Sequence, residues 1–358
     1  MSCETGVENT LCQFIDQTGE AVQPLPEFAE IPRNLIPLYR AMLLTRMFDE
    51  KAVSLQRTGR LGTYASSLGQ EAVGVGVAAA MRKDDVLLPS FREQSAMLWR
   101  GVSMTELLLY WGGDERGSDF TAVRQDFPIC IPVGTHFPHA TGVGFALKQG
   151  KNDAVAVAIA GDGATSKGDF YEALNVAGVW HLPVIFVINN NQWAISVPRS
   201  RQTASETLAQ KAVAAGIEGV RVDGNDVVAV RQIVSQAIGR ARKNNAPTLI
   251  EAVTYRLTDH TTADDASRYR SDEEVSKYWQ YEPLRRLRDY LEKISAWNRS
   301  DEEILHKEIS KQVDDAVKAY LEMPSQPITS MFDYLYGELP GVLRQQRTMA
   351  ADGGIKDA

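Results

Sequence analysis

The stretch that decides the fold is residues 159–197, which read IAGDGATSKGDFYEALNVAGVWHLPVIFVINNNQWAISV. Residues 154–160 form a short apolar run that is typical of a buried parallel strand. Residues 168–180 have the apolar spacing of a helix, and residues 183–188 form a second buried strand. A strand, a helix and a strand in this order form a right-handed βαβ unit, so the sequence predicts a parallel sheet.

Each of these two predicted strands ends in a polar turn. The first turn is Gly161-Asp162-Gly163, and the second contains Asn191, which lies 29 residues after Asp162. Open α/β sheets bind ligands at the carboxyl ends of neighbouring strands. The side-chain oxygens of Asp162 and Asn191 suit Mg²⁺, and the two glycines let a diphosphate approach the backbone. The structural alternative is a helix cap and a plain turn, but a spacing of one helix plus one strand favours a ligand site.

The two turns resemble a known family. GDGATSKGDFYEALNVAG at 161–178 and NNNQWAIS at 189–196 are similar to the alpha subunit of the heterotetrameric 2-oxo acid dehydrogenases. These are the decarboxylating components of the pyruvate and branched-chain 2-oxo acid dehydrogenase complexes. The resemblance runs from about residue 35 to about residue 345 and implies the thiamin diphosphate-binding fold, with thiamin diphosphate and Mg²⁺ as cofactors.

The resemblance also assigns roles to individual residues. It implies that Mg²⁺ is held by Asp162, Asn191 and the main-chain carbonyl of Trp193. It implies that the cofactor is bound by Phe91, Arg92, Ile131, Val133, Gly161, Asp162, Gly163, Ala164, Asn191, Arg256 and His260. Phe91 replaces the Tyr that is more usual in the family, and without the resemblance Arg92 reads as an ordinary surface residue.

The stretch 129–147 lies along the cofactor in the family, where main-chain groups near Ile131 and Val133 hold the aminopyrimidine. Residues 129–133 are predicted as a strand and residues 140–147 as a helix of small residues. His136 and His139 replace the Gln that is common in relatives. We expect Pro138 to disrupt any helix between them, which argues against a metal pair and favours packing in the active site.

Residues 256–270, RLTDHTTADDASRYR, have too few apolar residues to be held by core packing. A long loop after a strand is usually functional or disordered. The resemblance implies that it carries the catalytic residue His260 and orders over the cofactor. The alternative is a solvated loop held by salt bridges. The phosphorylated Ser found in animal relatives just after that His is replaced by Thr261, and nothing in the sequence says whether Thr261 is modified.

Composition excludes several classes of function. The 358 residues carry a net charge of −8, so there is no basic surface for nucleic acid. No stretch approaches the roughly 20 apolar residues of a membrane span, and the first residues do not form a signal peptide. The three cysteines are not in a metal-binding spacing, so we expect reduced thiols and a cytoplasmic protein.

The order of the predicted elements defines the domains. A strand–helix–strand–loop–helix–strand–helix–strand pattern predicts an α/β fold with a doubly wound, mostly parallel sheet and C-terminal helices. We assign residues 1–33 to an N-terminal arm that is ordered only when a partner holds it, and 34–275 to the thiamin diphosphate-binding domain. Residues 276–348 are expected to be a helical extension of the same domain, and 349–358 a disordered tail.

The function implied by the resemblance is oxidative decarboxylation of a 2-oxo acid, with acyl transfer to the lipoyl-lysine of a dihydrolipoyl acyltransferase. In the family a separate beta subunit supplies the Glu that activates the aminopyrimidine, so we expect an α₂β₂ enzyme. The stretches LGQEA, MLWRG and ASET at 204–207 favour pyruvate, whereas FDYLYGELP near the C-terminus also resembles branched-chain enzymes. Acetoin dehydrogenase is a further alternative.

Two hypotheses from other classes stay open at this point. A nicotinamide-dependent oxidoreductase needs G-x-G-x-x-G after a strand, and the sequence has none in that setting. A non-catalytic α/β binding module would not require Mg²⁺, so metal-dependent binding of thiamin diphosphate would exclude it.

Overall fold

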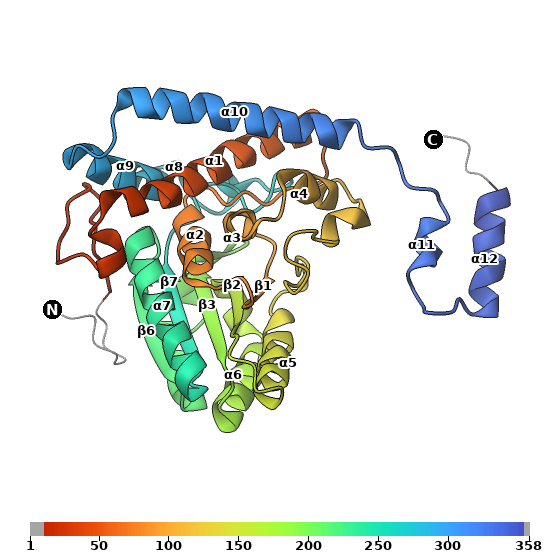
Figure 1. Ribbon diagram of the computed structural model, residues 1–358, viewed down its shortest axis with the longest axis horizontal. Helices are drawn as coiled ribbons and strands as arrows, with labels where there is room; N and C mark the ends of the chain where they lie inside the picture. Colours follow the sequence, from red (N-terminus) through yellow and green to blue (C-terminus); the bar gives the residue numbers. More distant parts are fainter. Residues whose placement is uncertain (1–10, 354–358) are drawn as a thin grey trace. The chain divides into compact units, whose positions relative to one another are not determined.

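The computed structural model describes residues 11–353. The chain divides into two compact units, Met1–Val317 and Lys318–Ala358, which we describe separately. The first unit contains the sheet and most of the helices (Figure 1). Its helices, apart from those introduced below, are α3 (Gln94–Arg100), α4 (Met104–Trp111) and α8 (Asp272–Tyr278).

A five-stranded parallel sheet forms the centre of this unit. Its spatial order is β1-β2-β3-β7-β6, and every neighbouring pair is parallel. The strands are β1 (Val86–Pro89), β2 (Ala156–Gly161), β3 (Val184–Asn190), β6 (Glu218–Asp223) and β7 (Thr248–Val253). A two-stranded antiparallel pair, β4 (Trp193–Ala194) and β5 (Val197–Pro198), follows β3. The predicted α/β class with a mostly parallel sheet is therefore confirmed.

Helices cover both faces of the sheet, because side chains that alternate along a buried strand point to opposite faces. One face packs on α5 (His136–Gln149) and α6 (Gly168–Trp180), through a core that includes Phe137, Phe170 and Phe186. α7 (Val227–Asn244) packs against β3, β6 and β7, and α2 (Glu71–Ala80) packs on α7. The α2–α7 contact is close, since a Cβ added to Gly76 would lie 2.7 Å from the Val230 side chain.

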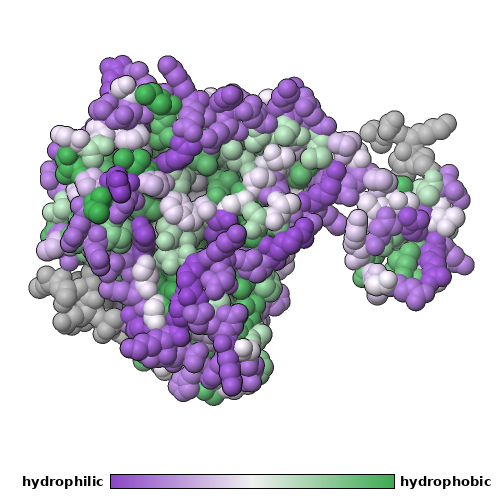
Figure 2. Space-filling view, in the orientation of Figure 1, coloured by the Kyte–Doolittle hydropathy of each residue, from purple (hydrophilic) through white to green (hydrophobic). Residues whose placement is uncertain are grey.

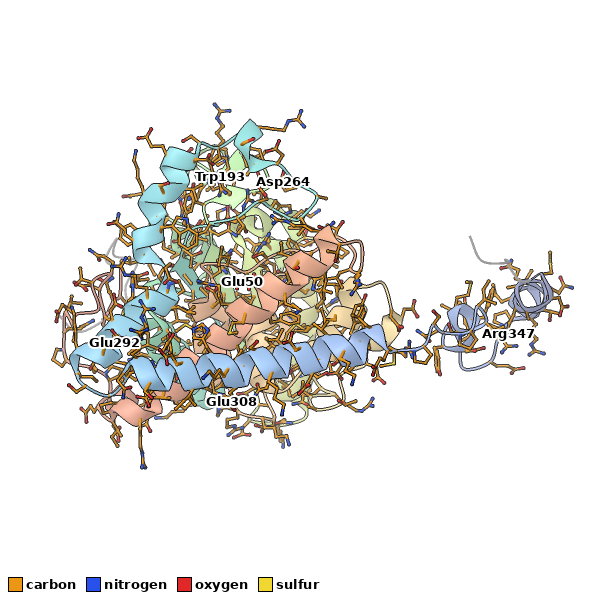
Figure 3. All side chains as sticks on the ribbon, turned by 90° about the horizontal axis from the view of Figure 1, so that it is seen from above. Glu50, Trp193, Asp264, Glu292, Glu308 and Arg347 are labelled. Carbon is orange, nitrogen blue, oxygen red and sulfur yellow. The ribbon has the colours of Figure 1, made fainter. Side chains whose placement is uncertain are left out.

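A further layer of long helices lies beyond α2. In Figure 1, α10 (Arg299–Leu321) runs along α1 (Ile36–Arg57), with α9 (Pro283–Lys293) at one end. Within residues 299–317, α10 is tied to α1 by two ion pairs of 2.8 Å, Arg40–Glu308 and Lys51–Asp314. Figure 3 shows Glu308 on this outer helix. The helix predicted at 168–180 is present as α6.

The N-terminal segment differs from its prediction. Residues 11–33 pack on their own chain instead of waiting for a partner. Cys12 bridges to Val222 of β6, and the backbone N–H groups of Phe14 and Ile15 donate to the Asp226 carboxylate at 2.7 and 2.8 Å. The segment is therefore held by backbone hydrogen bonds, which its polar composition does not reveal. Residues 1–10 of the expected arm lie outside the described residues.

The second compact unit, Lys318–Ala358, includes residues 318–348, which we expected to belong to the helical extension of the main domain. It contains α11 (Ser330–Asp333) and α12 (Gly341–Asp352), linked by an Arg347–Asp333 ion pair of 2.8 Å. α12 includes residues 349–352, which we expected to be disordered. The rest of that expected tail, residues 354–358, lies outside the described residues.

Two further features of the described chain are the hydropathy of its surface and the state of its cysteines. The face of residues 11–317 seen in Figure 2 is mainly hydrophilic, with small hydrophobic patches. No helix of the described part of the chain is long and apolar enough to cross a membrane. Cys130 is a free thiol as expected, whereas Cys3 lies outside the described residues.

Candidate functional site

A cavity of about 400 Å³ opens at the carboxyl ends of β1, β2 and β3. Parallel strands bring their carboxyl ends to one edge, so turns that are distant in sequence meet there. Nearly every residue to which the sequence assigns a role lines this cavity: Phe91, Arg92, Ile131, Val133, Gly161, Asp162, Gly163, Ala164, Asn191, Trp193 and His260. Arg256 does not line it but contacts residues that do.

Asp162 begins a short 3-10 turn, Asp162–Ser166, directly after β2. Its side chain is buried, with one oxygen, Oδ2, accepting a hydrogen bond from Gln202. The other oxygen, Oδ1, has no hydrogen-bond partner among the residues that the structure describes. Burial raises the pKa of this carboxyl to about 6, and a ligand of positive charge would reverse that effect.

Gly161 and Gly163, the two glycines beside Asp162, have different surroundings. A Cβ at Gly163 would lie 2.7 Å from the Cβ of Ala194, so only glycine lets this turn pack against β4. A Cβ at Gly161 would meet nothing within 4 Å, and Gly161 lines the cavity. The backbone at Gly161 is therefore open to a bound group, as the sequence predicts.

Asn191 follows β3 and faces the same cavity. Its Oδ1 accepts a hydrogen bond from the backbone N–H of Trp193 at 3.2 Å, and its Nδ2 donates to Gln70 Oε1 at 2.9 Å. An amide oxygen has two lone pairs, so Oδ1 can still accept a second partner. The carbonyl of Trp193 lies 3.5 Å from Nη1 of Arg256. Gln70 was not predicted to be part of the site.

Arg92 and His260 form a contact between two distant loops. Arg92 follows β1 and is buried, and its Nη1 donates to the carbonyl of Ser66. Its Nη2 donates to the carbonyl of His260 at 2.8 Å and lies 3.2 Å from His260 Nδ1. Burial, followed by repulsion from Arg256, lowers the pKa of Arg92 to about 10, so this guanidinium is still charged at neutral pH. The alternative of an exposed Arg92 is excluded.

His260 is neutral in this environment. Burial and the nearby Arg92 and Arg256 lower its pKa to about 4. Because Nδ1 lies 3.2 and 3.5 Å from guanidinium groups, which only donate, Nδ1 carries the lone pair and Nε2 the proton. The ring of Phe91 meets the His260 ring edge-on, with centroids 5.8 Å apart.

The loop of residues 254–271 is held by Arg256, which is fully buried. Its guanidinium donates to the carbonyl of Ile195 at 2.9 Å and to the hydroxyl of Tyr269 at 2.7 Å. Tyr269 in turn donates to Asp264, which accepts from the backbone N–H of His260. Figure 3 shows Trp193 and Asp264 at the same end of the molecule. Buried and half-buried hydrogen bonds therefore hold this loop in place. The alternative of a solvated loop does not describe it.

The segment 129–139 departs from its prediction in two ways. Residues 129–133 form no strand, and the only pairing described there is a bridge between Cys130 and Ser90. α5 begins at His136, so Pro138 does not disrupt the helix: it lies in the first turn, where a missing N–H costs little. His136 is buried in the cavity wall and donates from Nε2 to the carbonyl of Ile159 at 2.9 Å.

The side chains that line the cavity suit a divalent cation bound together with a diphosphate. Asp162 offers a carboxylate oxygen without a partner in the described part of the chain, Asn191 offers a free lone pair, and Arg92 adds positive charge. Mg²⁺ is usually bound by one or two carboxylates and phosphate oxygens, so a protein site with few ligands is typical. His139 is exposed, and the described residues contain no cluster of three or more His, Cys, Asp or Glu that suits a metal.

Comparison with known proteins agrees with this geometry. Residues 39–329 match the family model described as "Dehydrogenase E1 component". The chain is 39% identical to the pyruvate dehydrogenase E1 component subunit alpha of Staphylococcus aureus, over 94% of this chain and 91% of that protein. It is 43% identical to the 3-methyl-2-oxobutanoate dehydrogenase subunit alpha of Mycobacterium tuberculosis, over 88% and 86%. The chain therefore belongs to the dehydrogenase E1 component family, as an E1 alpha subunit of a 2-oxo acid dehydrogenase.

Proposed function

We propose that the chain acts with a beta subunit in the oxidative decarboxylation of pyruvate, using thiamin diphosphate and Mg²⁺. The acyl group then passes to the lipoyl-lysine of a dihydrolipoyl acyltransferase in the cytoplasm. Family membership implies the use of thiamin diphosphate. The observation that supports Mg²⁺ is the buried Asp162 Oδ1, which lacks a partner among the described residues and shares its cavity with Asn191 and Arg92.

Each residue has a separate task in this proposal. Asp162, Asn191 and the Trp193 carbonyl hold Mg²⁺, and that carbonyl keeps a lone pair for the metal beside its 3.5 Å contact with Arg256. Arg92 binds the diphosphate. Gly161 and Gly163 let the diphosphate approach the backbone. The backbone near Ile131 and Val133 holds the aminopyrimidine, with Phe91 and Ala164 also in the cavity wall.

The chemistry is divided between cofactor and protein. When bound, thiamin diphosphate supplies the centre that stabilises a carbanion. His260 holds a proton on Nε2 and a lone pair on Nδ1, so it can donate or accept a proton at the loop that borders the cavity. Arg256 fixes this loop by bonds to Ile195 and Tyr269, which orients His260.

The need for a beta subunit is supported by what the cavity wall contains. Ile131 and Val133 are 48% and 46% exposed, so this edge is open to a partner. Among the described residues, the only carboxylates that line the cavity are Asp162 and Glu93. Glu93 is buried and accepts hydrogen bonds from Ser90 Oγ and the Arg92 N–H. The Glu that activates the aminopyrimidine is therefore expected from the beta subunit.

A surface for subunit contact is supported on α5 and α6. The rings of Phe145 and Trp180 lie tilted to each other with centroids 5.3 Å apart, but the two residues are 41% and 51% exposed, and Val179 is 64% exposed. The small residues Ala72, Gly74, Gly76 and Ala78 of α2 are buried within the chain and are not available for subunit contact. We therefore assign the α₂β₂ contact to the α5–α6 face.

The test of substrate is steady-state kcat/KM of the chain with its beta subunit, for pyruvate and for 3-methyl-2-oxobutanoate. Our proposal predicts a preference for pyruvate of about tenfold or more, because one or two extra methyl groups change binding by roughly 1–3 kcal/mol. A reversed preference would assign the chain to the branched-chain enzymes, which the Mycobacterium tuberculosis relative favours. Acetoin is the third substrate to be measured.

A further inference from the structure

Gln70 connects two asparagines of the site through one atom. It precedes α2, lines the cavity and is 2% exposed. Its Oε1 accepts hydrogen bonds from Nδ2 of Asn191 at 2.9 Å and from Nδ2 of Asn189 at 3.2 Å. Gln70 lies 119 and 121 residues before the two asparagines, so this contact exists only in the folded chain.

The orientation of these amides follows from one group that can donate a hydrogen bond but cannot accept one. The backbone N–H of Trp193 only donates, and it donates to Oδ1 of Asn191 at 3.2 Å. Nδ2 of Asn191 must therefore point to Gln70, and Gln70 must present its oxygen there. The hydroxyl of Thr254 donates to Oδ1 of Asn189 at 2.7 Å and orients that amide in the same way.

This orientation leaves the side-chain nitrogen of Gln70, a residue that lines the cavity, without a partner among the described residues. Nε2 is buried and has no hydrogen-bond partner among residues 11–353. A buried donor without an acceptor is unfavourable, and that cost is recovered when a ligand supplies an acceptor. The cavity also holds Arg92, so an anionic oxygen is the acceptor that its charge favours.

We propose that Gln70 has two roles toward the bound cofactor. Its Oε1 positions the Asn191 amide, so that the second lone pair of Oδ1 stays available to Mg²⁺. Its Nε2 donates a hydrogen bond to an oxygen of the diphosphate. This inference rests on the proposed function, because it assumes that the cavity holds a metal and a diphosphate.

Two variants of the full chain separate the roles. Gln70→Glu keeps an acceptor for both asparagines but replaces the donor by an oxygen. Gln70→Leu removes the acceptor and the donor. Two binding measurements are made on each variant. Binding of Mn²⁺ is measured by electron paramagnetic resonance in the presence of saturating inorganic diphosphate. Binding of inorganic diphosphate is measured by calorimetry in the presence of saturating Mn²⁺.

A hydrogen bond to a charged group contributes roughly 1.5–3 kcal/mol, which corresponds to about a tenfold to hundredfold change in affinity. We expect Gln70→Glu to weaken diphosphate binding by at least about tenfold, with Mn²⁺ affinity within about threefold of wild type. We expect Gln70→Leu to weaken both. Wild-type diphosphate affinity in Gln70→Glu would overturn the donor role, and wild-type Mn²⁺ affinity in Gln70→Leu would overturn the positioning role.

Two controls distinguish the possible failures. Gln94→Leu removes another buried amide, which does not line the cavity, and it should leave both affinities unchanged. Asp162→Ala should abolish Mn²⁺ binding. If Asp162→Ala binds Mn²⁺ like wild type, the proposed metal site itself fails. If Asp162→Ala loses binding while both Gln70 variants bind normally, only the inference about Gln70 fails.

Discussion

At the scale of single residues, Asp162 is the group on which the proposed metal site depends. Its pKa is raised to about 6 by burial, so the ionised carboxylate is unfavourable in the ligand-free chain. A carboxyl whose folded pKa lies above its unfolded value loses stability as the pH rises from about 4 to about 6. Above pH 6 the free energy of unfolding should therefore not fall when this carboxylate is removed.

We predict that Asp162→Ala abolishes Mg²⁺-dependent binding of thiamin diphosphate and keeps the fold. The carboxylate is the only anionic protein ligand assigned to the metal. Calorimetric titration with thiamin diphosphate and Mg²⁺, together with a melting curve at pH 7.5, measures both effects. Asp315→Ala, on the exposed side of α10, is the control. An affinity of Asp162→Ala close to wild type would refute the assignment.

His260 gives the second prediction at this scale. His260→Ala should slow acylation of a free lipoyl domain by about 10² to 10⁴, the usual loss for a proton-transfer group. Its effect on cofactor binding should be smaller, since Arg92 and Asp162 remain. Decarboxylation with an artificial acceptor and reductive acylation are measured on the same preparation, with His306→Ala on α10 as a control. Losses below tenfold in both assays would mean that His260 is only a structural residue of its loop.

At the scale of elements, the loop of residues 254–271 should respond to acid. The pKa of His260 is lowered to about 4 in the closed loop, whereas an exposed imidazole has a pKa near 6.5. A base with a lowered pKa contributes stability above its unfolded pKa, and this is lost as the pH falls from 6.5 toward 4. Hydrogen exchange of the loop, corrected for the intrinsic pH dependence, should accelerate over this range.

The control for this prediction is His260→Gln. Glutamine keeps a hydrogen-bond acceptor at this position but does not change its charge between pH 6.5 and 4. The acid-induced acceleration should shrink in His260→Gln. The same acceleration in both proteins would show that a group other than His260 controls the loop.

The N-terminal segment and α7 share one carboxylate. Asp226 caps α7 through the N–H groups of Val228 and Ala229 and accepts from Phe14 and Ile15. We predict that Asp226→Ala lowers the free energy of unfolding by about 2–4 kcal/mol, because a cap and two buried backbone donors lose their partner. Ser271→Ala removes only the cap of α8 and should cost about 1 kcal/mol. Urea denaturation compares the two, and equal losses would contradict this account.

The elements that the sequence predicts well are those with a strong local signal. The apolar runs at 154–160 and 183–188 and the helix at 168–180 are found within two residues of their expected bounds. The expected strand at 129–133 failed because its apolar residues line the cavity edge instead of pairing. The order of residues 11–33 was missed because it depends on Asp226, more than two hundred residues away.

At the scale of the whole molecule, the fold brings the site together from separate turns. Turns rich in Gly, Asp and Asn can be recognised in the sequence, and they meet because the strands are parallel. Gln70 could not be recognised, because its partners, Asn189 in β3 and Asn191 just after it, lie 119 and 121 residues further on. The neutral state of His260 was also hidden, since it follows from burial and from the approach of Arg92.

The chain is expected to be one half of an active site. The open edge at Ile131 and Val133 and the α5–α6 face leave room for a beta subunit. The most direct measurement is pyruvate-dependent reduction of an artificial electron acceptor, with thiamin diphosphate and Mg²⁺, by the purified chain before and after addition of its beta subunit. The account predicts no turnover by the chain alone and full turnover of the mixture, lost again on removal of Mg²⁺. Turnover by the chain alone, or none by the mixture with any 2-oxo acid, would contradict it.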